Sequence, residues 1–261
     1  LVRKLEKFIN HRADMILTSS IQARRLLKQS FKVGDQKIQP LPDCVDLSRF
    51  DPFRYSADQK SALRARLNIP EDHALVVYLG LLTDYQGIPH IIEAASHLMG
   101  VGEKVHFLIM GFPNINYYKE LAKGYGVSDV VTFTGKIPYD DAPFFLSLGD
   151  IAITAKQSAT EGSGKLLNYM ALGLPVVAYD TPVHREYLGD AGSYVAPGET
   201  ADLAHAISRL AKHKDEARLK GNLLRERVSN LFTWRNAARQ IDSVYETLCE
   251  QGDSAPRLRE G

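Results

Sequence analysis

The sequence predicts an α/β protein built on a doubly wound, Rossmann-like parallel sheet. Short runs rich in apolar and β-branched residues recur along the chain, and longer stretches with helical periodicity separate them. The runs are apolar at successive positions, which is typical of strands that are covered on both faces. Alternating strands and helices of this kind form parallel sheets with helices on both sides.

The predicted elements alternate regularly from about residue 74 onward, and one further strand precedes them. Each expected strand ends in glycine or small polar residues, and the strands are placed at 14–18, 75–79, 105–110, 130–133, 151–154, 175–178 and 193–195. The expected helices between them are 89–98, 117–125, 142–148, 165–172 and 200–212. Thr233 can cap a last helix that closes the domain and ends near Glu250.

Prolines mark a boundary before the main sheet begins. Pro40, Pro42 and Pro52 make segment 38–55 stiff and extended, and we interpret it as an interdomain linker. The chain begins within a helical pattern, so we expect residues 1–37 to be the remnant of an N-terminal domain. The Rossmann-like domain is then expected at 56–232, the closing helix at 233–250 and a disordered tail at 251–261.

The composition excludes several classes of function. The chain has 261 residues, of which 44% are apolar and 24% charged, enough to bury a sizeable core. Its 32 basic and 31 acidic residues are interspersed, which leaves no positive field for a nucleic-acid backbone and favours a small polar ligand. No run approaches the roughly 20 apolar residues of a membrane-spanning helix. Cys44 and Cys249 have the spacing of neither a disulfide framework nor a zinc site, which suits a cytoplasmic protein.

Glycine turns lie at two places where a ligand could approach the sheet. Gly80 follows the predicted strand 75–79, and Gly87 precedes the predicted helix 89–98. Backbone N–H groups at such strand ends and helix starts bind phosphate in open α/β sheets. Turns of this kind are also common where nothing binds, so by themselves they do not decide the function. The dinucleotide fingerprint Gly-x-Gly-x-x-Gly follows none of the strands, which disfavours an NAD-dependent enzyme.

A more specific pattern spans residues 161–177, where a loop, a helix, a turn and a buried strand are predicted in succession. The Gly-Ser-Gly sequence at 162–164 frees the backbone at the helix start, and Lys165 adds a cation where the helix dipole already attracts an anion. Glu161 can accept hydrogen bonds from sugar or ribose hydroxyls, and Asn168, one turn further, can face the same ligand. The alternative is a solvated carboxylate, a surface lysine and a buried amide without a ligand.

Seven segments occur in an order that matches a known family. They are Ala-Asp-Met-Ile-Leu-Thr-Ser-Ser at 13–20, Pro-Asp-Cys-Val-Asp at 42–46, the turn at Gly80, Met-Gly at 110–111, Gly-Lys-Ile-Pro at 135–138, the pattern at 161–177 and Phe-Thr-Trp at 232–234. Together they resemble the C-terminal, donor-binding domain of the group-1 (family 4) retaining glycosyltransferases, which have the GT-B fold of two Rossmann-like domains. The similarity extends from about residue 11 to residue 250.

The resemblance implies an enzyme that transfers a sugar from a nucleoside diphosphate sugar, such as a UDP- or GDP-sugar, to an acceptor with retention of configuration. It implies neither a metal nor a cofactor. Glu161 and Lys165 are the catalytic candidates, with Glu161 binding the transferred sugar and Lys165 the diphosphate. The base is expected against the turns at 111–112 and 135–137. The substrate-binding candidates are Gly80, Leu81, Gln86, Gly87, Gly111, Phe112, Lys136, Ile137, Gly162, Ser163, Gly164, Leu166 and Asn168.

In the family that the chain resembles, the acceptor site and several catalytic groups lie on the N-terminal domain. The resemblance therefore implies that this chain is a fragment that carries the donor-binding half and is inactive alone. The missing domain would hold the acceptor and could supply a peripheral membrane contact.

The sequence departs from the family's pattern at three charged positions. The usual diphosphate-binding arginine and lysine fall on Leu81 and Gln86, and the second donor glutamate falls on Asn168. Lys165 is the expected substitute for the missing cations, and Glu161 matches the first donor glutamate only if one loop residue is deleted. Two alternatives therefore stay open, namely a nucleotide-sugar-binding or regulatory module without turnover and a GT-B-like nucleotide-sugar epimerase.

Overall fold

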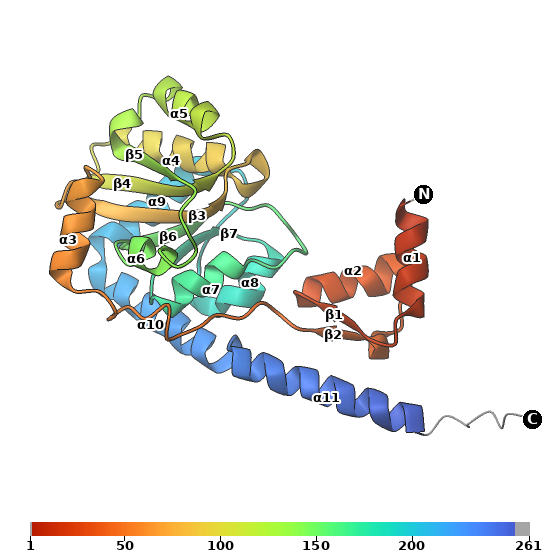
Figure 1. Cartoon of the computed structure of the whole chain (residues 1–261). Helices are drawn as coiled ribbons and strands as arrows, with labels where there is room; N and C mark the ends of the chain where they lie inside the picture. The colour runs from red at the N-terminus through yellow and green to blue at the C-terminus, as the bar shows by residue number, and fades with distance from the viewer. Residues whose placement is uncertain (1, 254–261) are drawn as a thin grey trace, which may run out of the picture.

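The computed structural model describes residues 2–253 and confirms the predicted α/β fold class (Figure 1). Its centre is a sheet of six parallel strands in the order β5-β4-β3-β6-β7-β8. The strands are β3 Ala74–Leu81, β4 Val105–Phe112, β5 Val131–Gly135, β6 Ile151–Thr154, β7 Val176–Tyr179 and β8 Ser193–Val195. The chain reverses direction across the sheet between β3 and β6, so their carboxyl ends form the switch point where open α/β sheets bind ligands.

Helices cover both faces of this sheet, as the strand sequences require. Val76 and Tyr78 of β3 pack with α4, α5 and α9, whereas the neighbouring Leu75 and Val77 pack with α6, α7, α8 and α10. The bounds of these helices are α4 Ile88–Gly100, α5 Ile115–Gly124, α6 Ala142–Leu146, α7 Gly164–Ala171, α8 Pro182–Leu188, α9 Thr200–Lys212 and α10 Lys214–Leu231. Each central strand therefore buries both faces, which explains its continuous apolar sequence.

The predicted strands and helices are present; the bounds of β6, β8 and α9 are as predicted, and the ends of the others differ by one or a few residues. β3 and β4 run through Gly80 and Gly111, which the sequence assigns to turns, because these two glycines pair side by side in the ladder. Five α-helices and strands of the described chain lie outside the predicted set, namely α2 Ile21–Phe31, β2 Ile38–Pro40, α3 Ala57–Arg66, α8 and α10. Single turns of 3-10 helix join the larger elements at η1 Asp35–Lys37, η2 Asp84–Gln86, η3 Ser128–Val130 and η4 Gly189–Ala191.

Residues 2–40 form a small unit beside the main sheet (Figure 1). The unit contains α1 Val2–Arg12, β1 Ile16–Thr18, α2 Ile21–Phe31 and β2 Ile38–Pro40. β1 pairs in parallel with β2, and Phe31 and Ile38 lie in its small core. The first three residues of the predicted linker 38–55 thus belong to this two-stranded sheet, and the extended connection starts after Pro40.

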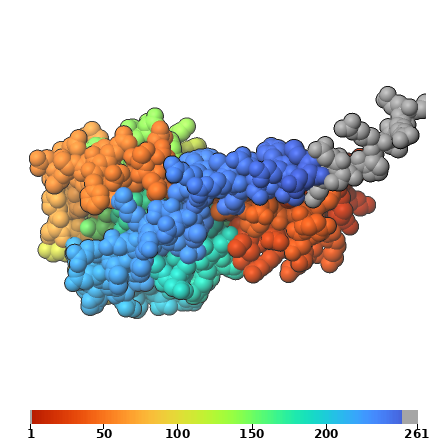
Figure 2. Space-filling model, turned by 90° about the horizontal axis from the view of Figure 1, so that it is seen from below, coloured from red at the N-terminus to blue at the C-terminus, as the bar shows by residue number. Residues whose placement is uncertain are grey.

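The closing helix α11, Trp234–Asp253, leaves the main sheet and runs alongside residues 2–40 (Figures 1 and 2). The connection after β2 meets the start of this helix, where the Val45 N–H donates to the carbonyl oxygen of Phe232 at 3.0 Å. The linker, the main sheet and α11 therefore meet at one place, next to the carboxyl ends of the strands.

Helix α11 begins as the sequence predicts, since Thr233 Oγ1 accepts a hydrogen bond from the Asn236 N–H at 3.3 Å. The helix continues beyond its predicted end, so the first three residues of the predicted tail 251–261 are helical. Residues 254–261 lie outside the described part of the chain. Among the helices described, none combines the length and the apolar character that a membrane-spanning helix needs.

Candidate functional site

The carboxyl ends of β3 and β4 present bare backbone at the edge of the sheet. Gly80 and Gly111 lie opposite each other in the ladder, with φ angles of +155° and +159° that residues with side chains rarely adopt. A Cβ on Gly111 would collide with the carbonyl oxygen of Gly80. Glycine is therefore required at Gly111 by the packing of the two strands, whereas Gly80 lines the pocket described below, where a ligand can approach its backbone.

Lys165 brings a cation to these strand ends from the first turn of α7. Its Nζ donates hydrogen bonds to Oε1 of Gln86 at 2.7 Å and to the hydroxyl of Tyr78 at 3.1 Å. The ammonium also lies 3.4 Å from the point where a Cβ of residue 80 would stand. The fold thus brings together Lys165, Gln86 and Gly80, which sequence reasoning selected from separate segments.

The groups that hold the Lys165 ammonium are all neutral. Lys165 forms no ion pair with any residue that the structure describes, and its Nζ lies 4.3 Å from the centre of the Tyr78 ring. Burial, followed by the nearby charge of Lys156, lowers the pKa of Lys165 to about 7, while Glu161 acts in the opposite direction. A partly buried ammonium without a counter-charge is unfavourable, and an anionic ligand would supply that charge.

Glu161 lies in the loop before α7, with 59% of its side chain exposed. Its Oε2 accepts a hydrogen bond from the Tyr85 hydroxyl at 2.9 Å and pairs with Lys156 Nζ, also at 2.9 Å. Burial raises the pKa of Glu161, but the hydrogen bonds from Lys156 and Tyr85 lower it more, so the pKa lies below its ordinary value. Glu161 is therefore an ionised acceptor at the same edge of the sheet.

Lys156 is a site residue that the sequence analysis missed. It follows β6, its side chain is only 4% exposed, and its Nζ also donates to the carbonyl oxygen of Gly162 at 3.1 Å. The available signal was a lysine two residues after a buried apolar strand, at the strand end where ligands bind. Lys156 gives the site a second cation, which is already paired with Glu161.

The other predicted residues at the start of α7 divide between the pocket and the core. The Ser163 hydroxyl is buried and makes no hydrogen bond with any described residue. Gly164 and Asn168 line the pocket beside the site. Leu166, in contrast, is fully buried, and its N–H donates to the carbonyl oxygen of Ser163 at 2.9 Å. Leu166 therefore supports the helix and has no side-chain surface to offer a ligand.

The pocket has a volume of about 730 Å³ and opens between the sheet edge, the linker and α11. Its polar groups include Asp43, which the sequence analysis treated only as part of the linker. Burial raises the pKa of Asp43, and the charge of Lys156 opposes this. The lining residues are Leu41, Pro42, Asp43, Cys44, Leu79, Gly80, Tyr139, Gly164, Lys165, Asn168, Trp234, Ala237, Ala238 and Ile241. Within the described part of the chain, no group of three or more His, Cys, Asp or Glu side chains is placed to hold a metal ion.

The two turns predicted to contact a base lie next to each other. Phe112 ends β4 and Lys136 follows β5, and the Lys136 Nζ lies 5.1 Å from the centre of the Phe112 ring. Phe112 is exposed, whereas Ile137 packs against the core. The neighbouring strand ends therefore offer an exposed aromatic ring with a cation over it.

Leu81 and Gly87 lie beside the site and contribute no charged group to it. Leu81 is half exposed, and its carbonyl oxygen accepts a hydrogen bond from the Tyr78 hydroxyl at 2.8 Å. Gly87 has a φ of +78°, and a Cβ there would collide with Ala155. Gly87 thus lets α4 begin directly against the end of β6, with the free N–H groups of its first turn at the same sheet edge.

The N-terminal unit holds the loop that precedes α7. Ser20 Oγ donates to the carbonyl oxygen of Thr160 at 2.5 Å, and Ser19 Oγ accepts from the Gly162 N–H at 3.3 Å. The Tyr187 hydroxyl, from α8, donates to the carbonyl oxygen of Ser19 at 3.0 Å. A Cβ on Gly162 would lie 2.8 Å from that hydroxyl, so the tight packing requires glycine.

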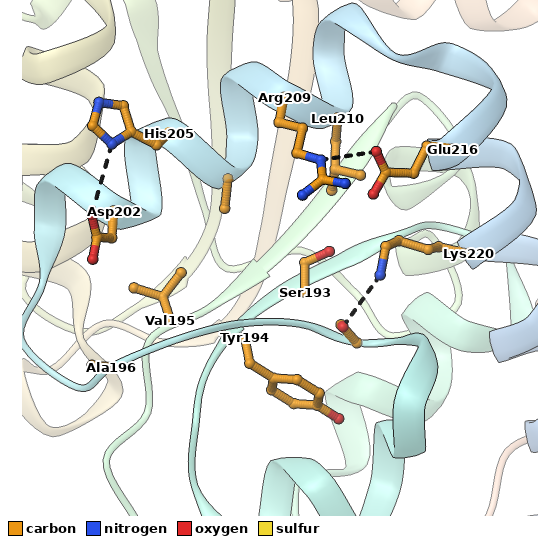
Figure 3. Close-up of a pocket in the computed structure, with 12 residues that line it drawn as sticks. Ser193, Tyr194, Val195, Ala196, Asp202, His205, Arg209, Leu210, Glu216 and Lys220 are labelled. Carbon is orange, nitrogen blue, oxygen red and sulfur yellow. Dashed lines mark hydrogen bonds and ion pairs between the residues drawn. The ribbon is translucent and has the colours of Figure 1, made fainter.

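A second hollow of about 540 Å³ lies between β8, α9 and α10, and none of the predicted site residues lines it (Figure 3). Its charged side chains already have partners, since Arg209 pairs with Glu216 at 2.9 Å and Asp202 with His205 at 3.7 Å. Lys220 donates to backbone carbonyl oxygens. Among the described residues, this hollow therefore has no buried cation without an anionic partner of the kind that Lys165 provides at the ends of β3 and β6.

A family model described as glycosyl transferases group 1 matches residues 59–223, which is more than half of the chain. The chain is similar to 2-deoxystreptamine glucosyltransferase of Streptomyces kanamyceticus, with 25% identity over 252 residues, covering 95% of this chain and 64% of the relative. The chain thus spans less than two thirds of that relative, and about half of some others.

Two solved structures are similar in fold. A glycosyltransferase from Rickettsia africae ESF-5 matches with a TM-score of 0.85 and 18% identity, covering 93% of this chain and 66% of that chain. Anabaena Alr3699/HepE, solved in complex with UDP and glucose, matches with a TM-score of 0.84 and 17% identity, covering 94% of this chain and 66% of that chain. At these identities the likeness concerns the fold alone.

Proposed function

Because the chain belongs to the family of glycosyl transferases group 1, we propose that it provides the donor-binding part of an enzyme that transfers a sugar from a nucleoside diphosphate sugar to an acceptor. The observation that carries the proposal is the ammonium of Lys165, which lies beside the backbone of Gly80 and whose hydrogen-bond partners among the described residues are all neutral. The dipole of α7 adds positive potential at the same point. A diphosphate would satisfy both.

Lys165 compensates for the cations that are missing after β3. The family resemblance places an arginine and a lysine at Leu81 and Gln86, and the Lys165 Nζ is hydrogen-bonded to Gln86 itself. A cation from α7 therefore lies beside one of the positions that lost its charge. The diphosphate would lie between Gly80 and the first turn of α7, where the unpaired Ser163 hydroxyl offers a further hydrogen bond. Stabilising the charge that develops on the leaving diphosphate is the main electrostatic contribution such a site makes to catalysis.

The sugar and the base would lie on opposite sides of the diphosphate. The ionised carboxylate of Glu161 can accept hydrogen bonds from sugar hydroxyls, and the exposed ring of Phe112, with Lys136 over it, can contact a planar base. The binding of UDP and glucose by Anabaena Alr3699/HepE, which has the same fold, supports a nucleotide sugar as the ligand. We further propose that transfer occurs with retention and that the acceptor is bound largely by residues outside this chain.

Binding of nucleotide sugars to the chain tests the proposal. Thermal melting with UDP-glucose, GDP-mannose, ADP-glucose and TDP-glucose would identify the base, since a ligand at 100 times its Kd stabilises a protein by about 2.7 kcal/mol. We expect one of these compounds, and the matching nucleoside diphosphate, to raise the melting temperature. If none of the four sugars and none of the four diphosphates binds, the proposed function is wrong.

Product analysis with the full-length protein tests the reaction itself. A new glycosidic product with the donor's anomeric configuration is expected. Donor binding without turnover would favour a regulatory module instead, and recovery of an epimerised nucleotide sugar would favour an epimerase.

A further inference from the structure

We propose that Lys156 is a positioning residue of the donor site, which fixes the Glu161 carboxylate so that one of its oxygens is held open for the sugar hydroxyls. The inference rests on the proposed function, because it assigns the sugar to the side of Glu161. It adds a residue from the end of β6 to a site otherwise built from β3, η2 and α7.

The first step is the burial of Lys156. Its side chain is 4% exposed, and its Nζ lies 2.9 Å from Oε2 of Glu161 and 3.1 Å from the carbonyl oxygen of Gly162. An ammonium removed from water is strongly unfavourable unless it is paired and hydrogen-bonded. These two neighbouring loop residues are therefore tied to one point of the sheet edge by the same buried charge.

The second step is the asymmetry of the Glu161 carboxylate. The hydrogen bond from the Tyr85 hydroxyl at 2.9 Å ends on Oε2, as the bond from Lys156 does. Oε1 accepts no hydrogen bond from any residue that the structure describes, and the side chain is 59% exposed. Oε2 thus serves as the anchor, and Oε1 keeps its full capacity to accept hydrogen bonds from hydroxyls.

The third step concerns the orientation of the Glu161 side chain, since other contacts already hold the backbone of its loop. The carbonyl oxygen of Thr160 accepts a hydrogen bond from Ser20 Oγ at 2.5 Å, and the Gly162 N–H donates to Ser19 Oγ at 3.3 Å. The Glu161 N–H donates to Ser158 Oγ at 3.0 Å, which closes the near end of the loop but does not orient the carboxylate. The contacts of Lys156 and Tyr85 with Oε2 supply that orientation. An acceptor held in place before binding loses less conformational entropy when the sugar arrives.

A comparison of sugar-bearing and sugar-free ligands distinguishes this role from a purely structural one. Calorimetry on the chain would use the nucleotide sugar found in the thermal panel, for example UDP-glucose, and the matching diphosphate UDP. For Lys156→Met, we expect the affinity for UDP-glucose relative to the affinity for UDP to fall by about tenfold, roughly the size of one hydrogen bond to a charged group. A general disturbance of the loop would weaken both ligands together and leave the ratio unchanged.

Further variants make the test specific to the contact with Glu161. Lys156→Gln removes the charge with a smaller change in polarity. It should lower the affinity for the nucleotide sugar relative to the diphosphate in the same way, and it serves as the test variant if Lys156→Met does not fold. In a Glu161→Gln background, Lys156→Met should cause little further change, because the two residues act as one unit. Lys104→Met is the matched control, since Lys104 forms an exposed pair with Asp72 at 2.7 Å at the start of β4 and should leave the ratio unaltered.

An unchanged ratio in the folded Lys156 variants, or losses that add in the double variant, would overturn the positioning role and leave the proposed function intact. If the unsubstituted chain binds none of the nucleotide sugars and none of the diphosphates, both proposals are wrong. The two failures are therefore distinguishable.

Discussion

Replacement of Lys165 by methionine removes the ammonium that has no anionic partner among the described residues, and it keeps a side chain of similar length. Among the residues that the structure describes, the ammonium donates hydrogen bonds to Gln86 and Tyr78 only, and the Tyr78 hydroxyl keeps its own hydrogen bond to the carbonyl oxygen of Leu81. Loss of a partly buried charge without a counter-charge should not unfold the chain. The variant therefore isolates the contribution of the charge to ligand binding.

The size of the effect follows from the type of hydrogen bond that is lost. A hydrogen bond between an ammonium and a phosphate oxygen contributes about 1.5–3 kcal/mol, which corresponds to roughly a 10- to 150-fold weaker affinity at about 1.4 kcal/mol per tenfold. The nucleotide sugar and its diphosphate should lose affinity to the same extent, because Lys165 contacts the portion that they share. Calorimetry with UDP and UDP-glucose, or with the pair chosen by the thermal panel, measures both.

The same variant should also change the pH dependence of binding. Burial and the charge of Lys156 lower the pKa of free Lys165 to about 7, and a bound diphosphate would raise this pKa. Below pH 7 the lysine is already protonated, so the affinity for the nucleotide sugar should be level. Above pH 7 binding requires uptake of a proton, and the affinity should fall by up to about tenfold per pH unit until the pKa of the complex is reached. In Lys165→Met this fall should disappear.

Two results would refute the reasoning on Lys165. The first is an affinity of Lys165→Met within about twofold of that of the unsubstituted chain, given that the charge-assisted bond is worth at least tenfold. The second is a fall in affinity above pH 7 that persists unchanged in the variant. Lys104→Met, whose ammonium pairs with Asp72 on the surface, is the control for the loss of one positive charge.

Three further changes test other parts of the account. Glu161→Gln should weaken binding of the nucleotide sugar by about 1 kcal/mol and leave the affinity for the diphosphate unchanged. In an assay of the proposed sugar transfer, turnover should fall modestly, and a glycosyl adduct on Glu161, detected by mass spectrometry, would refute its role in binding. Gly111→Ala should lower the free energy of unfolding, measured in urea, by about 1–3 kcal/mol, because the alanine Cβ would collide with the carbonyl oxygen of Gly80. Ser20→Ala removes the cap of α2 and the bond to Thr160, so the melting temperature should fall, with a loss of about 1–2 kcal/mol; an unchanged melting curve would contradict this contact.

The main sheet could be predicted from the sequence because its central strands are apolar on both faces. β3, with Leu75 and Val77 on one face and Val76 and Tyr78 on the other, illustrates the pattern. The start of α7 could be predicted for a similar reason, since the glycines, the serine and Lys165 are contiguous. These parts of the fold and the site could therefore be predicted because the residues that define them are adjacent in the sequence.

The partners across the site could not be predicted in the same way. Lysine side chains are rarely buried, so nothing in the sequence indicated that Lys156 would be buried at the edge of the sheet, where it pairs with Glu161. Asp43 and Ser20 reach the site only because the linker and the N-terminal unit fold back against the loop before α7. Such contacts join residues more than a hundred positions apart and depend on tertiary packing. The position of Leu166 within the motif likewise did not show that its side chain would be fully buried.

A crystal structure of the chain with the nucleoside diphosphate selected by the thermal panel would locate the diphosphate relative to Lys165. We expect the diphosphate between Gly80 and the first turn of α7, with a phosphate oxygen about 2.7–3.2 Å from the Lys165 Nζ. We also expect the base to lie against Phe112 and Lys136. A diphosphate bound away from Lys165, for example in the hollow between β8, α9 and α10, would contradict the account.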